Sequence, residues 1–372
     1  MKYYIIAGEA SGDLHGSNLI KELKKFDDSA DIRCWGGDKM QAAGGELVKH
    51  YRDLAFMGFT EVLMNLRTIF KNLAFCKEDI LQYKPDTLIL IDYPGFNLRI
   101  AKWAKEQGIK VIYYISPQVW AWKEGRVKMM KECIDKMLVI LPFEKDYFKN
   151  KWNLEVEYVG HPLVEVIERQ KTEVKSEKFS DRSIIALLPG SRKQEILKKL
   201  PVMLEVSKSF PNYQFIVAKA PGVEETFYDD LLKPYSNVSY VSDQTYDLLM
   251  QARAALVTSG TATLETALFG VPEIVCYKGS YISYQIGKRL VKVKYISLVN
   301  LIMDKLVVKE LIQDDMTVEN LKQELQELLT NEQRRAELQK NYADLKKILS
   351  EGGNASSKAA QSIVHFLAAF TA

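Results

Sequence analysis

Residues 3–13 have the sequence YYIIAGEASGD. The apolar run at its start is followed by small and polar residues, and then by the helical pattern of Leu14–Phe26. An apolar strand, a small-residue turn and an amphipathic helix are typical of a parallel sheet covered on both faces. The same features return at Ser183–Leu188 and the turn after it. The chain therefore predicts an α/β fold with two similar doubly wound domains.

More short apolar runs predict the rest of the two sheets. They are Thr87–Ile91, Val111–Ile115 and Met137–Leu141 in the first half, and Tyr213–Val217, Ala254–Thr258 and Glu273–Tyr277 in the second. The charged stretch Glu165–Arg182 between the halves predicts an exposed helix and a linker. Near the end, Asn354 is expected to cap a last helix, Ala355–Phe370.

Composition excludes several classes of protein. The chain has 372 residues, 47% of them hydrophobic and 27% charged, with a net charge of +3. This length favours two domains, and the near-neutral charge gives no nucleic-acid signature. The four cysteines are scattered, which argues against a zinc site or a disulfide scaffold. No run suggests a signal peptide or a spanning helix, so a membrane role would be peripheral.

Two turns in the second half suit phosphate groups. At Gly190 a strand ends, Ser191 can cap the next helix, and Arg192 is expected in its first turn. The helix dipole disfavours a cation there unless an anion is shared with the helix amides. Ser259, Gly260 and Thr261 form the second turn, and Glu265 follows where a carboxylate could accept hydrogen bonds from ribose hydroxyls. Ordinary helix caps and a solvated arginine are the alternative interpretations.

Asp92 lies at the carboxyl end of a buried strand, where open α/β sheets place their ligands. It is a candidate general base, and Asn97 is expected to cap the following helix in its place. Trp120 and Trp122 follow the next strand and suit either a sugar and acyl site or core packing. His161 is a candidate ligand donor, although a lone histidine is more often structural.

Two segments suit a membrane surface. In Phe59–Phe75 one helical stripe, including Phe70, is assigned to the core, while Met64 and Phe75 share another side with Arg67 and Lys71. Between Lys278 and Met303 there are five basic residues and no acidic one, among them Lys288, Arg289 and Lys292. The alternative is solvated charge over ordinary core packing.

Taken together, these motifs resemble the lipid-A-disaccharide synthase family, in the order in which that family has them. The matching segments are Ala7–Asp13, Ser116–Trp122, Leu141–Glu144, Gly160–Pro162, Leu188–Arg192, Ser259–Glu265, Lys288–Lys292 and Ser297–Leu301. The resemblance implies a GT-B glycosyltransferase, in which two Rossmann-like domains face a cleft. It implies an N-terminal domain of residues 1–165, rejoined by a helix at about 352–372, and a UDP-sugar domain of residues 166–351.

The family's reaction transfers 2,3-diacylglucosamine from UDP to 2,3-diacylglucosamine 1-phosphate (lipid X), with inversion. By resemblance Asp92 is the base, Arg192 binds the UDP diphosphate, and Glu9, Ser11 and His161 lie on the acceptor side. The remaining nucleotide contacts would be Ser191, Ser259, Gly260, Thr261, Glu265 and Asn300.

The resemblance also implies no cofactor and no obligatory metal, and the chain has no D-x-D triplet. The expected partners are the two lipid substrates and the anionic inner membrane of a Gram-negative cell, approached from the cytoplasm. A homodimer is one possible assembly, and nucleic acid is not expected. The alternatives are a UDP-sugar 2-epimerase and a non-catalytic nucleotide- or lipid-binding protein on the same fold.

Overall fold

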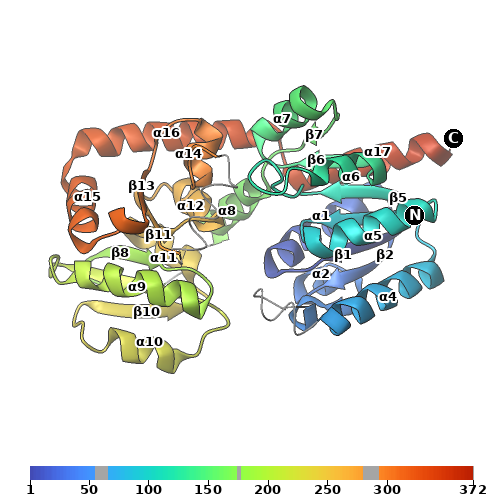
Figure 1. Cartoon of the computed structure of the whole chain (residues 1–372). Coiled ribbons are helices and arrows are strands. Elements are labelled where there is room, and N and C mark those ends of the chain that lie inside the picture. Colours follow the sequence, from blue (N-terminus) through green and yellow to red (C-terminus); the bar gives the residue numbers. More distant parts are fainter. Residues whose placement is uncertain (55–65, 174–176, 280–292, 372) are drawn as a thin grey trace. The chain divides into compact units, whose positions relative to one another are not determined.

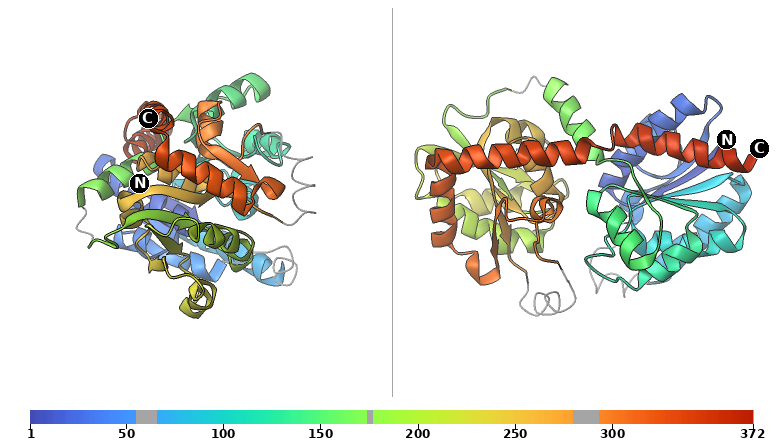
Figure 2. Two further views of the ribbon diagram at one scale, coloured as in Figure 1. Left: turned by 90° about the vertical axis from the view of Figure 1, so that its left-hand side faces the viewer. Right: turned by 90° about the horizontal axis from the view of Figure 1, so that it is seen from above.

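The computed structural model describes residues 1–54, 66–173, 177–279 and 293–371. The chain divides into two compact units (Figures 1 and 2). Unit 1 contains Met1–Pro162 and Leu349–Ala372, and unit 2 contains Leu163–Ile348. The chain thus passes from unit 1 to unit 2 after Pro162 and returns to unit 1 after Ile348. The family resemblance implied these boundaries after residues 165 and 351.

Unit 1 is built on a seven-stranded parallel sheet with the order β3-β2-β1-β4-β5-β6-β7. Its strands are β1 (Lys2–Ala7), β2 (Asp31–Gly36), β3 (Glu46–His50), β4 (Thr87–Ile91), β5 (Lys110–Tyr114), β6 (Lys136–Val139) and β7 (Glu157–Tyr158). The strand order reverses at β1, so the sheet is doubly wound and its switch point lies between β1 and β4.

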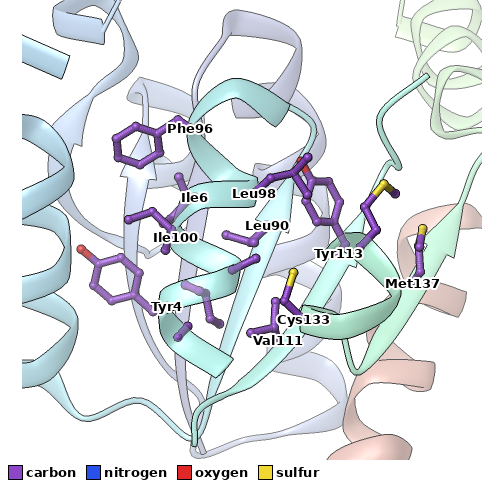
Figure 3. Packing of buried hydrophobic residues seen from close by; sticks show 14 of the residues in the cluster. Tyr4, Ile6, Leu90, Phe96, Leu98, Ile100, Val111, Tyr113, Cys133 and Met137 are labelled. Atoms are coloured by element: carbon purple, nitrogen blue, oxygen red, sulfur yellow. The ribbon is translucent and has the colours of Figure 1, made fainter. Parts of the chain in front are cut away.

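Helices cover both faces of this sheet because its strands are apolar on both faces. In β1, Tyr4 and Ile6 pack into the cluster that includes helices α4 to α7, whereas Tyr3, Ile5 and Ala7 pack toward α1, α2 and α17. Figure 3 shows the first cluster, with Tyr113 and Leu98 among its members. The helices are α1 (Ala10–Phe26), α2 (Asp38–Ala42), α4 (Leu66–Tyr83), α5 (Pro94–Glu106), α6 (Arg126–Cys133), α7 (Pro142–Trp152) and α17 (Ala355–Thr371), with a 3-10 turn η1 (Tyr51–Leu54).

Unit 2 repeats this plan with a six-stranded parallel sheet, in the order β10-β9-β8-β11-β12-β13. Its strands are β8 (Ser183–Leu188), β9 (Tyr213–Lys219), β10 (Val238–Ser242), β11 (Ala252–Thr258), β12 (Glu273–Tyr277) and β13 (Lys309–Ile312). Its helices are α8 (Pro162–Glu173), α9 (Lys193–Ser207), α10 (Glu225–Leu232), α11 (Thr245–Gln251), α12 (Thr261–Leu268), α14 (Leu298–Met303), α15 (Val318–Thr330) and α16 (Glu332–Ser350), with a 3-10 turn η2 (Gln313–Asp315). The two doubly wound domains expected from the sequence are confirmed.

Strands β2, β3, β7, β10 and β13 were not expected from the sequence. Four of them lie at a sheet edge, where one side has no neighbouring strand. Residues of β3 and β10 are only partly buried, so these strands lack the continuous apolar run that marks a central strand. The stretch Glu165–Arg182, expected as an exposed helix and linker, also differs, because Val166 and Ile167 of α8 are buried.

The C-terminal helix α17 belongs to unit 1, where it packs against α1. Asn354 caps it as expected, since its Oδ1 accepts a hydrogen bond of 2.7 Å from the Ser357 amide. Before this cap the chain runs against the segment after β7. A Cβ on Gly352 would lie 2.2 Å from the Gly160 nitrogen and 2.5 Å from the Val159 carbonyl carbon. Only glycine allows the two backbones to approach so closely.

Gly352→Ala is therefore expected to destabilise the protein by about 1–3 kcal/mol, because backbone atoms must move to accommodate the methyl group. Chemical denaturation followed by circular dichroism measures this loss. Gly125→Ala is the matched control, since a Cβ there meets no atom within 4 Å. An equal stability of the two variants would contradict the close contact.

Candidate functional site

Each unit has a hollow at the carboxyl edge of its sheet. In unit 1 it is a cavity of about 390 Å³ beside the ends of β4 and β5. It is lined by Asp92, Pro94, Ile115, Ser116, Pro117, Gln118, Val119, Trp122, Lys123 and Arg126. Two motifs far apart in sequence, the Asp92 turn and the segment Ser116–Trp122, therefore share one cavity.

The backbone at Asp92 is in an uncommon conformation. Asp92 and Tyr93 have φ angles of 44° and 48°, in the left-handed region that non-glycine residues rarely adopt. Such residues cost about 1–3 kcal/mol each and persist only when their surroundings hold them. The Asp92 carbonyl oxygen accepts hydrogen bonds from Asn97 Nδ2 at 2.8 Å and from the Tyr113 hydroxyl at 2.5 Å. These two donors hold the turn that presents the Asp92 side chain.

The expectation that Asn97 caps the following helix is wrong. Helix α5 begins at Pro94, and Asn97 lies inside it with no exposed surface. Besides the bond to Asp92, its Nδ2 lies 3.2 Å from the Ile91 carbonyl oxygen and 3.4 Å from that of Ile6. Asn97 therefore links the ends of the two strands at the switch point.

The Asp92 carboxyl group is more basic than an ordinary aspartate. Burial, reinforced by the negative charge of Glu9, raises its pKa to about 6. A carboxylate in this range can accept a proton near neutral pH, which is what a general base requires. Glu9, the N-cap residue of α1, and Ser11, in the first turn of that helix, are both exposed.

Asp13, the last residue of this turn motif, has a structural task. Its carboxylate accepts hydrogen bonds from the amides of Gly37 at 2.8 Å and Met40 at 3.0 Å. It thus binds the start of α2 and does not cap its own helix, which begins at Ala10. This contact fixes α1 against the loop that follows β2.

Sequence reasoning gave Glu144 no role, but the structure shows that it supports the cavity wall. It is 1% exposed and accepts hydrogen bonds from Ser116 Oγ at 2.8 Å, Trp120 Nε1 at 3.2 Å and the Leu141 amide at 3.0 Å. Burial raises its pKa to about 7, and these donors oppose the rise. The ring of Trp120 packs edge-on against Phe143, whereas Trp122 is 56% exposed and lines the cavity.

His161 is buried and does not line the unit 1 cavity. Its amide donates to the Leu349 carbonyl oxygen at 3.2 Å, where the chain re-enters unit 1. Burial, followed by the charge of His15, lowers the pKa of His161 to about 3, so its imidazole is neutral at pH 7. We therefore assign it a structural position rather than a place among the groups around Asp92.

The hollow of unit 2 is a pocket of about 360 Å³ at the ends of β8, β9 and β11. The two turns with small residues meet there, since Gly190, Ser191, Ser259, Gly260, Thr261 and Glu265 all line it. The other lining residues are Leu188, Glu195, Ala218, Lys219, Ala220, Pro221, Thr245, Thr258 and Ala262. Helix α12 begins at Thr261, so its free amides lie beside the pocket and favour an anion.

Glu265 is fixed within this pocket by Tyr246. The Tyr246 hydroxyl donates to Glu265 Oε1 at 2.7 Å, and its ring packs against Phe269. Burial raises the pKa of Glu265. Ser259 is also held, because its hydroxyl donates to the Ile296 carbonyl oxygen at 2.7 Å.

Two expectations about the start of α9 need correction. Arg192 is the N-cap residue, with φ −119°, and so precedes the first helical turn. Ser191 is therefore not the capping residue, and no side chain makes a capping hydrogen bond at this end of α9. The Arg192 side chain is 60% exposed and pairs with Glu195 at 3.5 Å. It does not line the pocket in this structure.

Asn300 is buried away from the pocket lining. Its Nδ2 donates to the Val308 carbonyl oxygen and to Glu310, and its Oδ1 accepts from the amides of Val307 and Val308. Because its amide group is fully used within the fold, we leave Asn300 out of the nucleotide site.

Of the residues expected at a membrane surface, Met64, Lys288, Arg289 and Lys292 lie outside the described residues. On α4, Arg67, Lys71 and Phe75 are exposed. The assignment of Phe70 to the core is wrong, because it is 63% exposed.

Of the helices in the described ranges, none has the length and apolar character needed to cross a bilayer. Within those same ranges no cluster of His, Cys, Asp and Glu is arranged to hold a metal ion.

Comparison with known proteins decides the family. The family model "Lipid-A-disaccharide synthetase" matches residues 3–365. The chain belongs to this family. Lipid-A-disaccharide synthases from Geobacter metallireducens and Syntrophus aciditrophicus are 39% and 40% identical to it, over 94% and 96% of this chain and 93% and 96% of theirs. Lipid-A-disaccharide synthase 1 of Legionella pneumophila is 38% identical, over 93% of this chain and 92% of its own.

Solved structures show that this family member has the GT-B architecture. The UDP-GlcNAc 2-epimerase of Neisseria meningitidis, solved with UDP-GlcNAc, matches with a TM-score of 0.69 at 13% identity, covering 98% of this chain and all of that one. The calicheamicin glycosyltransferase CalG4 matches with a TM-score of 0.63 at 14% identity, covering 100% of this chain and 99% of its own. At such identities the likeness concerns the fold alone.

We expect Asp92→Asn to raise the free energy of unfolding of this protein at neutral pH. The native pKa of about 6 lies above the reference value of 3.8, so ionisation of Asp92 disfavours the folded state. The variant should gain nothing below about pH 4 and roughly 2–3 kcal/mol above pH 6. Urea denaturation at pH 4.0 and pH 7.5 measures the gain. A variant that is less stable at both pH values would contradict the conclusion that ionisation of Asp92 disfavours the folded state.

Proposed function

We propose that this chain transfers a 2,3-diacylglucosamine unit from UDP to 2,3-diacylglucosamine 1-phosphate, releasing UDP. Membership of the synthetase family makes it a glycosyltransferase of lipid A biosynthesis. The observation that carries the finer assignment is Asp92, a partly buried carboxylate with a raised pKa in a cavity on the switch-point edge. The epimerase alternative is not favoured, because the epimerases share only the fold, at 12–14% identity.

In the proposed mechanism, Asp92 takes the proton of the acceptor 6-hydroxyl. The hydroxyl oxygen forms a bond to the anomeric carbon of the donor, and the bond from that carbon to the UDP diphosphate breaks with its electron pair. Attack opposite to the leaving group inverts the anomeric centre. One base and a stabilised leaving group are sufficient for this step.

UDP is proposed to occupy the pocket of unit 2. Backbone amides at Gly260 and Thr261 would bind the diphosphate at the start of α12. Glu265, held by Tyr246, would accept hydrogen bonds from the ribose hydroxyls. Arg192 would turn from its exposed pairing with Glu195 to the diphosphate, since a bidentate guanidinium suits phosphate oxygens.

The acceptor is proposed to occupy the cavity of unit 1. Glu9 and Ser11, which are exposed where β1 leads into α1, are proposed to contact the acceptor. The exposed ring of Trp122 lines the cavity and offers an apolar surface to a sugar face or an acyl chain. Glu144 acts on this cavity indirectly, because it fixes Ser116 in the wall and Trp120 behind it.

The pH dependence of the reaction tests the role of Asp92. We expect kcat/KM to fall with unit slope below about pH 6, where Asp92 becomes protonated. Glu9→Gln should move this limb to lower pH, because it removes the negative charge that helps raise the Asp92 pKa. Asp92→Ala should lower turnover about 10²–10⁴-fold while UDP still binds. Near-normal turnover of Asp92→Ala would refute the assignment.

Contact with an anionic membrane is also proposed, through the face of α4 that carries Arg67, Phe70, Lys71 and Phe75. An exposed aromatic pair beside two cations suits the boundary between headgroups and acyl chains. This placement would bring the protein to substrates that reside in the bilayer. The cytoplasmic side of the inner membrane and a homodimer remain predictions of the family resemblance.

Phe70→Ser should weaken binding to vesicles that contain anionic phospholipid by about 10- to 150-fold, because one buried phenyl ring contributes roughly 1.5–3 kcal/mol. Vesicle co-sedimentation measures the effect. Leu306→Ser is the control, since Leu306 of unit 2 is exposed to a similar extent, 60% against 63%. Equal losses in both variants would argue against α4 as the contact.

A further inference from the structure

Lys199 is a buried cation beneath the Gly190 turn. It lies in the second turn of α9 and is 3% exposed. A Cβ placed on Gly190, whose φ is +118°, would lie 3.4 Å from Lys199 Nζ and 3.0 Å from Glu195 Oε2. Both charged groups therefore lie directly under a turn that lines the unit 2 pocket.

Three other cations of this region have carboxylate partners. Arg192 pairs with Glu195 at 3.5 Å, Lys193 with Glu224 at 2.5 Å, and Lys219 with Glu225 at 3.1 Å. The ammonium group of Lys199 makes neither a hydrogen bond nor an ion pair with any residue of the described ranges. The nearby Cys276 thiol gives no negative charge, because burial raises its pKa to about 12.

An unpaired charge in this position is unfavourable for the fold. Burial lowers the pKa of Lys199, and the charge of Glu195 opposes this only in part. Replacing such a group with an apolar side chain of similar volume often stabilises a protein. A negative ligand in the adjacent pocket would add to the counter-charge that Glu195 supplies only in part.

We propose that Lys199 balances the charge of the nucleoside diphosphate in the unit 2 pocket and so stabilises the departing UDP. The inference rests on the proposed function, since it takes this pocket to be the UDP site. The cation would act together with the amides of α12, and its effect would depend on the phosphates rather than on the nucleoside.

The test compares Lys199→Met with Lys198→Met in the full-length protein. Lys198 is the exposed neighbour on the same helix, so both variants lose one positive charge from the same place in the sequence. Calorimetric titration with UDP should show binding weakened at least about ten-fold in Lys199→Met, and unchanged in Lys198→Met. Binding of uridine, followed by ligand-observed NMR, should be the same in both variants.

Thermal unfolding without ligand separates this role from a structural one. Lys199→Met should unfold at an equal or higher temperature, with a gain of about 2–4 °C per kcal/mol of relieved charge burial. Lys199→Gln is the second variant, and it should show the same loss of UDP binding. A folded Lys199→Met that binds UDP like the wild type would overturn the inference alone. A Lys199→Met variant that fails to fold would also overturn the inference, because Lys199 would then have a structural role. A wild-type protein that does not bind UDP would overturn both the inference and the proposed function.

Discussion

Parallel strand pairing is the constraint on which the rest of the structure depends. Both sheets are parallel throughout their described strands, so all carboxyl ends of a sheet lie at one edge. Helices cover both faces and leave this edge as the place where polar groups can meet a ligand. The turns after β4 and β5 in unit 1, and after β8, β9 and β11 in unit 2, therefore carry side chains of the two hollows.

The two hollows hold charges of opposite sign that the fold leaves incompletely balanced. In unit 1 the Asp92 carboxylate is partly buried near Glu9, another negative group. In unit 2 Lys199 lies beneath the Gly190 turn without a carboxylate partner in the described part of the chain. Each charge suits the group that the proposed reaction brings to it: a proton to Asp92 and a diphosphate to Lys199. Functional sites commonly retain such unfavourable groups at a cost in stability.

Much of this arrangement could be predicted from the sequence, because central strands carry their own signal. The runs that became β1, β4, β8 and β11 are continuous and apolar, and the turns after them contain Asp92, Gly190 and Ser259. The edge strands β3 and β10 were missed because partial burial allows polar residues in them. Local sequence therefore predicts the edge at which a site forms better than it predicts the full sheet.

The supporting residues of the site could not be predicted from sequence spacing alone. Asn97 was expected to cap a helix, but it binds carbonyl groups at the ends of β1 and β4, a contact between residues 91 positions apart. Glu144 supports a wall that begins at Ser116, 28 positions earlier in the chain. Asn300 was expected at the nucleotide, but it is satisfied by Val307, Val308 and Glu310. In each case the partner is set by tertiary packing rather than by helical or strand periodicity.

The most direct test of the proposed reaction is the release of UDP from UDP-2,3-diacylglucosamine in detergent micelles, measured with and without 2,3-diacylglucosamine 1-phosphate. The proposed reaction predicts release only when the acceptor is present, together with a disaccharide 1-phosphate of the expected mass. Release of UDP at the same rate without the acceptor would contradict it, because the bond to the diphosphate would then break without a sugar hydroxyl to attack.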